Sequence, residues 1–115
     1  KTDTTTWGTK ALNIAATGAV DATVADTTDV TATTSGANTT TILGGKAVSV
    51  TGGTGATSIT GDGLTTVSVK GGGAVTIDNT LNSGTSMGTT MTSVILDGVD
   101  ADSEIKGQGL TDVTV

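Results

Sequence analysis

The densest group of side chains that could do chemistry is the acidic stretch DGVDADSE at residues 97–104. Four carboxylates fall within it, those of Asp97, Asp100, Asp102 and Glu104. Calcium prefers about six to eight hard oxygen ligands, gathered from carboxylates and backbone carbonyls at close spacing. The stretch therefore predicts a calcium site, although its residue order is not that of an EF-hand loop. The alternative is a solvated acidic loop between two strands.

No other group of residues offers conventional catalytic chemistry. The chain has 115 residues and contains no His, no Cys and no Arg. The most common general base and the thiol nucleophile are therefore absent. Ser and Thr are abundant, but none has a recognisable activating neighbour. We therefore expect the protein not to be an enzyme, and we place a polysaccharide-degrading enzyme fragment behind the structural and binding functions considered below.

Charge and composition exclude further classes of partner. The net charge is −6 and all five basic residues are Lys, so no basic patch can neutralise the phosphates of nucleic acid. No window approaches the roughly 18 apolar residues of a membrane-spanning helix, so we expect no membrane insertion. Trp7 is the only aromatic residue, and we expect it to cap the first coil rather than to stack on a sugar. Any core must therefore be thin and aliphatic.

Short runs of alternating apolar and polar residues recur along the whole chain. The elements that they predict must position the acidic residues named above. Each run has a period of two, is rich in β-branched residues and is bounded by Gly, Asn, Asp or Ser, which is typical of β-strands. No segment has helical periodicity. Residues 32–38 and 81–92 are interpreted as loop insertions. The predicted strands are residues 11–15, 20–25, 29–33, 39–43, 47–51, 57–60, 66–70, 74–78, 93–97, 103–106 and 111–115.

The chain also repeats itself. TSITGDGLTTVSV (57–69) aligns without gaps on SEIKGQGLTDVTV (103–115), 46 residues later, with seven identities in thirteen positions. A weaker echo pairs KALNI (10–14) with KAVSV (46–50), 36 residues apart. In the longer repeat a strand containing Ile59 or Ile105 is followed by a Gly-x-Gly corner and an inward-pointing Leu. Glycine at such a corner permits positive φ and close approach of backbones.

These features predict an all-β fold, a parallel β-solenoid or β-helix of short strands with glycine corners. The alternative is an immunoglobulin-like β-sandwich, which also needs short strands about 8–12 residues apart. The internal repeat favours the solenoid, and so does the absence of Tyr and Pro. Residues 1–115 are expected to form a single β-repeat module of a longer surface protein.

The stretch GGTGATSIT (52–60) resembles the glycine-rich calcium nonapeptide of RTX proteins. Its three glycines and Ile59 stand where that pattern requires them, but Thr57 replaces the aspartate. A hydroxyl group cannot supply the charge of that aspartate, so we expect corners held by glycine geometry rather than by a row of calcium ions.

The composition of the whole chain is similar to the Thr/Gly-rich β-repeat regions of bacterial type I secreted surface proteins, such as S-layer proteins and large adhesins. This resemblance implies a structural repeat module at the extracellular bacterial cell surface, contacting copies of itself or neighbouring repeats. It also implies that calcium orders the assembly. The alternative is a carbohydrate-binding surface module whose partner is cell-surface carbohydrate.

Overall fold

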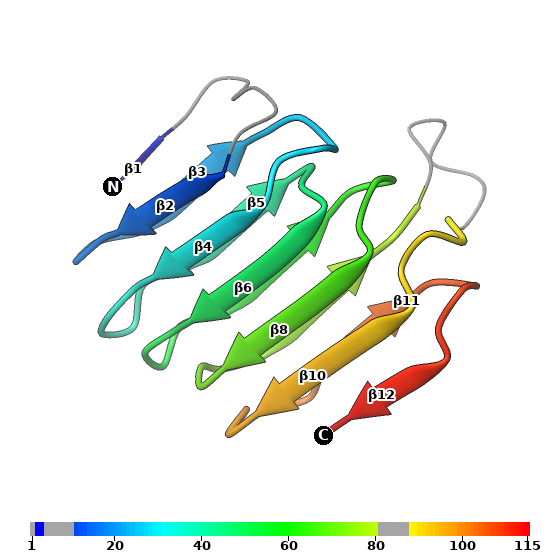
Figure 1. Cartoon of the computed structure of the whole chain (residues 1–115). Coiled ribbons are helices and arrows are strands. Elements are labelled where there is room, and N and C mark those ends of the chain that lie inside the picture. Colours follow the sequence, from blue (N-terminus) through cyan, green and yellow to red (C-terminus); the bar gives the residue numbers. More distant parts are fainter. Residues whose placement is uncertain (1, 4–10, 81–87) are drawn as a thin grey trace.

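The computed structural model describes residues 2–3, 11–80 and 88–115, and every regular element in them is a β-strand. Two six-stranded sheets face each other, and the chain passes from one to the other at each successive strand (Figure 1). One sheet contains the odd-numbered strands: β1 (Thr2–Asp3), β3 (Val20–Thr23), β5 (Thr40–Leu43), β7 (Thr57–Thr60), β9 (Val75–Asp78) and β11 (Glu104–Lys106). The other contains the even-numbered strands: β2 (Leu12–Ala15), β4 (Val30–Thr33), β6 (Ala47–Thr51), β8 (Thr66–Lys70), β10 (Ser93–Asp97) and β12 (Asp112–Thr114).

Every strand pair in the described residues is parallel, so the chain is a parallel β-solenoid and the prediction of this fold is confirmed. The immunoglobulin-like alternative is wrong, because its sheets are antiparallel. All eleven predicted strands are present, and β1 is the one strand that was not predicted. No helix in the described part of the chain is long and apolar enough to span a bilayer.

The register explains the two sequence echoes. Leu12 pairs with Val30 and Val30 with Val48, so one coil there takes 18 residues and the weaker echo spans two coils. Ile59 pairs with Ile77 and Ile77 with Ile105. The longer repeat therefore also spans two coils, and Ile59 and Ile105 occupy the same inward column, as predicted.

The core is a thin layer between the two sheets. In β3 to β10 alternate residues point inward and are buried, while their neighbours are more exposed, which is why period-two patterning is visible although all strands are parallel. Burial comes from the coils above and below as well as from the opposite sheet. The fully buried large side chains are those of Val20, Val30, Ile42, Val50, Ile59, Leu64, Val67, Val69, Val75, Ile77, Met91 and Val94.

One coil carries a long insertion. Residues 79–92 join β9 to β10, and the register offset across this coil rises to 27 residues from Thr66 to Ser93. The insertion predicted at 81–92 is therefore confirmed by the length of this coil. Asn79 and Met91 lie near the two ends of this connection, and both are completely buried. The insertion predicted at 32–38 is wrong in its first part, because Ala32 lies in β4 and is buried in the core.

Asn79 anchors the chain on both sides of this insertion. Its Nδ2 donates to the carbonyl of Gly61 at 2.8 Å and to the hydroxyl of Thr90 at 3.3 Å. Its Oδ1 accepts a hydrogen bond from the backbone N–H of Met91 at 3.2 Å. A buried amide with these partners fixes where the chain leaves and re-enters the coil.

The Gly-x-Gly corner at 61–63 requires glycine for close backbone approach and not for positive φ. The positive-φ glycines of the described residues include Gly44 and Gly71 but neither Gly61 nor Gly63, so the predicted positive φ is wrong at these corners. What they require is close approach: a Cβ on Gly61 would lie 3.1 Å from the backbone of Gly44, and one on Gly63 would lie 2.6 Å from the carbonyl oxygen of Asp26.

The contact between Gly63 and Asp26 crosses two coils. The corner after β3 spans residues 24–29 and the corner after β7 spans residues 61–65, but the corner between them has only residues 44–46. Because the middle corner is short, the corners above and below it come into contact. This is a departure from strict nearest-neighbour stacking.

Candidate functional site

The four acidic residues of the predicted calcium site lie around the connection between β10 and β11. Asp97 is the last residue of β10, and Glu104 is the first residue of β11. Asp100 and Asp102 lie in the connection, where the backbone N–H of Asp100 donates to the carbonyl of Gly72 at 3.1 Å. All four side chains are exposed.

The structure spreads these carboxylates out. Within the described ranges, no group of three or more His, Cys, Asp or Glu side chains lies in an arrangement that could hold a metal ion. Glu104 Oε1 instead lies 3.3 Å from Lys106 Nζ in an exposed ion pair on the same strand. These four residues on their own therefore do not form a preformed calcium cage.

The nonapeptide-like stretch, residues 52–60, forms the connection from β6 to β7 and the whole of β7. Its glycines lie against the coil before it: a Cβ on Gly53 would lie 2.5 Å from the backbone nitrogen of Gly36, and one on Gly55 would clash with the carbonyl of Asn38. Thr57 faces the interior and is 2% exposed. The position that matches the calcium-binding aspartate is therefore inside the core here.

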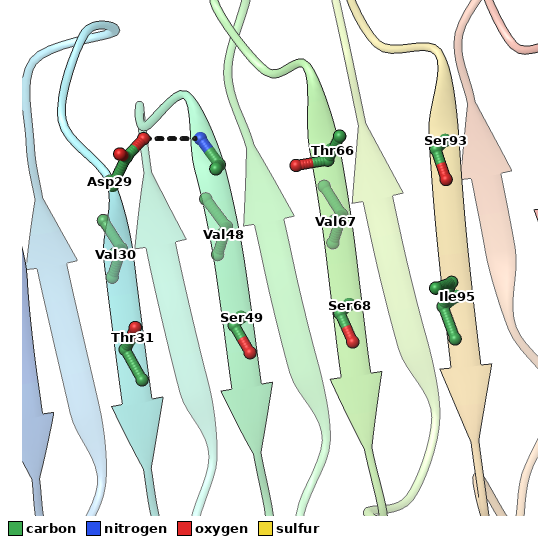
Figure 2. A pocket seen from close by; sticks show the side chains of 11 residues that line it. Asp29, Val30, Thr31, Val48, Ser49, Thr66, Val67, Ser68, Ser93 and Ile95 are labelled. Atoms are coloured by element: carbon green, nitrogen blue, oxygen red, sulfur yellow. Dashed lines mark hydrogen bonds between the residues drawn. The ribbon is translucent and has the colours of Figure 1, made fainter.

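A second candidate site lies on the outer face of the even-numbered sheet. A shallow open groove of about 390 Å³ crosses β4, β6, β8 and β10 (Figure 2). Ser49 and Ser68 occupy equivalent outward positions on adjacent strands, and Thr31 and Ile95 stand on either side of them in the same row. The groove forms because two small side chains lie between two larger ones. Its lining residues are Asp29, Val30, Thr31, Ala47, Val48, Ser49, Thr66, Val67, Ser68, Ser93 and Ile95.

The groove offers hydroxyl groups at regular spacing and little charge. Successive parallel strands lie about 4.8 Å apart, so the hydroxyls of Thr31, Ser49 and Ser68 repeat at that interval along the stack. Asp29 is the only ionisable residue of the lining, and its Oδ1 accepts a hydrogen bond from the backbone N–H of Ala47 at 3.3 Å. Such a surface can hydrogen-bond a polar chain lying along the solenoid axis.

This groove was not predicted from the sequence. The strands AVSVT and TVSVK each place Ser at the centre of an alternating run, which marks a small outward residue. That signal shows a small side chain in each strand, but it does not show that the two lie side by side. The register of β6 against β8 supplies that information.

A pair of carboxyl groups lies at the corner where two coils touch across a third. Partial burial raises the pKa of the Asp26 carboxyl above its ordinary value of 3.8. The hydrogen bond that the protonated Asp26 carboxyl donates to Asp62, and the negative charge of Asp62, raise this pKa further. Asp62 is the middle residue of the Gly-x-Gly corner at 61–63. Nothing in the sequence pairs it with Asp26, 36 residues earlier.

Trp7, the predicted cap, lies outside the described residues. No family model matches the sequence, and no curated protein or solved structure matches it either.

Proposed function

We propose that the chain is a structural repeat module of an exported bacterial cell-surface protein, of the S-layer or adhesin-stalk kind, similar in style to RTX repeat regions. It works outside the cell as a stiff spacer and contacts copies of itself or neighbouring repeats. We assign it no catalytic role, because the sequence supplies no His, Cys or Arg.

One observation carries this proposal: the inward columns continue from coil to coil without interruption. Val30, Val48, Val67 and Val94 follow one another in register and are at most 2% exposed. A stack in which each coil repeats the contacts of the last can be lengthened without redesigning the core. Its outer faces carry mostly Thr, Ser and other small residues, which gives smooth surfaces suited to lateral packing.

The structural role is tested by electron microscopy and sedimentation of the purified chain over a range of concentrations, beside a panel of polysaccharide hydrolysis assays. We expect ordered assemblies at high concentration and no hydrolysis. Turnover of any polysaccharide, or dispersed monomers at every concentration, contradicts the structural role.

Calcium ordering is the second part of the proposal. Because Asp97, Asp100, Asp102 and Glu104 do not converge in one chain, we propose that calcium acts where these acids meet groups of an adjacent module. Calorimetric melting of the assembled protein with calcium, and then with a chelator, tests this. We expect a higher midpoint with calcium, and an unchanged midpoint removes the four acids as ligands. A D100N/D102N variant is the matched control.

The groove on the even-numbered sheet favours a second function, binding of surface carbohydrate. Regularly spaced hydroxyls fit a linear polyhydroxylated chain, although the groove has no aromatic residue for sugar stacking. A glycan array tests this function directly. We expect Ser68→Leu, which fills the groove, to abolish any binding, whereas Ser58→Leu on the outer face of β7 leaves it unchanged. Equal binding by both variants contradicts a role for the groove.

A further inference from the structure

The groove on the even-numbered sheet lies within the stack. Each of the strands that it crosses, β4, β6, β8 and β10, has a paired strand on both sides. Its shape therefore does not depend on an open sheet edge. Figure 2 shows two rows of outward side chains across it. One row contains Asp29, Ala47, Thr66 and Ser93, and the other contains Thr31, Ser49, Ser68 and Ile95.

The groove has the size of a short segment of one extended chain. β4 and β10 are three strand spacings apart, so with about 4.8 Å per spacing the groove is about 14 Å long. Its volume of about 390 Å³ falls in the range of about 300–1,000 Å³ that is usual for sites that bind small molecules. The groove is shallow and open, so a chain can enter and leave it without being threaded.

The charge of the groove disfavours anionic ligands. Asp29 is the one ionisable residue in the lining, and no Lys lines the groove to neutralise a phosphate, sulfate or carboxylate group. The net charge of −6 adds to this repulsion.

The Asp29 carboxylate instead favours a ligand that carries a cation. A carboxylate only accepts hydrogen bonds, and the strongest ones come from charged donors such as an ammonium group. The N–H of Ala47 donates to Asp29 Oδ1 at 3.3 Å, and the two carboxylate oxygens together have room for further donors, because each has two lone pairs. A protonated amine on the ligand can therefore bind here.

The other end of the groove offers an apolar contact. Ile95 is 44% exposed and lies diagonally across the groove from Asp29 (Figure 2). Its side chain can cover the C–H face of a sugar ring and remove apolar surface from water. Between Asp29 and Ile95, the hydroxyls of Ser49 and Ser68 can each donate and accept, as the ring hydroxyls of a sugar do. A lysine-rich peptide supplies cations but no ring hydroxyls for these positions.

We propose that the groove binds a linear polysaccharide of amino sugars whose amines are not acetylated, and that Asp29 selects it through the charged amine. This inference rests on the second proposed function, binding of surface carbohydrate, and names the class of carbohydrate. One sugar ring packs against Ile95, and the ammonium group of a ring nearer β4 pairs with Asp29. The serine hydroxyls bind ring hydroxyls between them. The selectivity comes from the amine, because neutral sugars share the other contacts.

NMR titration of isotopically labelled protein tests this selection. The two probes are tetramers of β-1,4-linked glucosamine and of β-1,4-linked N-acetylglucosamine, which differ only in the acetylation of the amine. The titrations are made at mildly acidic pH, where the free amines are protonated, and at low ionic strength, where an exposed charge pair is least screened. We expect the glucosamine tetramer to bind more tightly and to shift the amide signals of Ser49, Ser68 and Ile95.

Asp29→Asn is the decisive variant, because it removes the charge and keeps an oxygen for the N–H of Ala47. We expect it to weaken binding of the glucosamine tetramer about threefold, the size usual for an exposed ion pair, and to leave binding of the N-acetylated tetramer unchanged. Glu104→Gln, on β11 of the opposite sheet, changes the net charge equally and is the matched control, with no expected effect. Circular dichroism checks that both variants fold.

The outcomes that overturn this inference are separable from those that overturn carbohydrate binding. Equal binding of the two tetramers, or an Asp29→Asn variant that binds glucosamine as the wild type does, overturns the selection by Asp29 but leaves carbohydrate binding. A pentamer of lysine that binds the groove as tightly as the glucosamine tetramer shows selection of charge alone and also overturns it. Binding of neither tetramer overturns both this inference and the carbohydrate function.

Discussion

The Ile-x-Gly-x-Gly-Leu-Thr-x-Val-x-Val pattern occurs in two surroundings, inside the stack at residues 59–69 and at its end at residues 105–115. The two copies share their backbone path and register, yet Val69 is fully buried and Val115 is 89% exposed. The difference teaches that each coil is supported from two sides by different residues. The glycines contact earlier coils, which both copies have. The apolar residues are also covered by a following coil, and among the described residues this coil is present only for the first copy.

The largest expected difference between the two copies is the loss of stability when the isoleucine of each is replaced by alanine. Ile59→Ala removes a fully buried side chain from the middle of the inward column and is expected to lower the free energy of unfolding by about 3–4 kcal/mol. Ile105→Ala removes a partly buried one and is expected to cost about 1 kcal/mol. Urea unfolding followed by circular dichroism measures both. Equal losses would show that the following coil contributes nothing to burial.

The coil between the two copies provides the second test. Asn79 stands in register with Gly61 and Gly107, and its buried amide bonds to the coil before it and to the returning insertion. Asn79→Ala removes the hydrogen bonds of its amide to the Gly61 carbonyl and the Met91 N–H. We expect it to lower the free energy of unfolding by about 2–3 kcal/mol. Asn79→Asp, which keeps the acceptor for Met91 and loses the donor to Gly61, is the informative control. A loss below about 0.5 kcal/mol in the alanine variant contradicts the anchoring role.

The glycines should behave alike in the two copies. A Cβ on Gly63 would lie 2.6 Å from the Asp26 carbonyl oxygen, and one on Gly109 would lie 3.1 Å from the Met91 carbonyl oxygen and closer still to that of Thr89. Because both contacts are with earlier coils, we expect Gly63→Ala and Gly109→Ala each to cost about 2 kcal/mol. Thermal melting of the two variants side by side measures this. A harmless Gly109→Ala would show that the terminal coil is not packed against its neighbour.

The smallest expected effect concerns the pair formed by Asp26 and Asp62. The second copy has no equivalent pair, because Gln108 stands in the place of Asp62. The folded-state pKa of Asp26 is raised above 3.8, so the folded state takes up this proton more readily than the unfolded state. The Asp26 carboxyl therefore adds most to the free energy of unfolding below pH 3.8. This contribution is lost as the pH rises through the folded-state pKa of Asp26. Asp62→Asn removes the neighbouring charge and is expected to stabilise the protein slightly at pH 7, with a smaller gain at pH 4.

Urea titrations at both pH values measure this gain. Asp112→Asn, which changes the net charge equally in the last coil, is the control. A gain for Asp62→Asn that does not depend on pH contradicts the coupling between Asp26 and Asp62.

The sequence predicted the strands and the stacking well, because these depend on local patterning. Alternation located all eleven runs, and the spacing of 46 residues placed Ile59 and Ile105 in one column. The corners were predicted less well: glycine is compatible with both positive φ and close approach, and only the neighbouring backbone shows which one Gly61 needs. The acidic stretch was read as a cluster, but proximity in sequence did not make its carboxylates converge in space.

The groove and the acid pair were missed for one common reason. Each is formed by residues on different coils, such as Ser49 with Ser68 and Asp26 with Asp62. Their separation in sequence depends on the lengths of the intervening corners. Those lengths vary from coil to coil, so a fixed repeat period cannot place the residues side by side.

The three-residue corner at 44–46 has a consequence for how this chain can change length. Removal of the coil that contains this corner, or insertion of a new coil beside it, separates or crowds Asp26 and Gly63, which touch only because that corner is short. We therefore expect natural gain and loss of coils to spare this part of the stack.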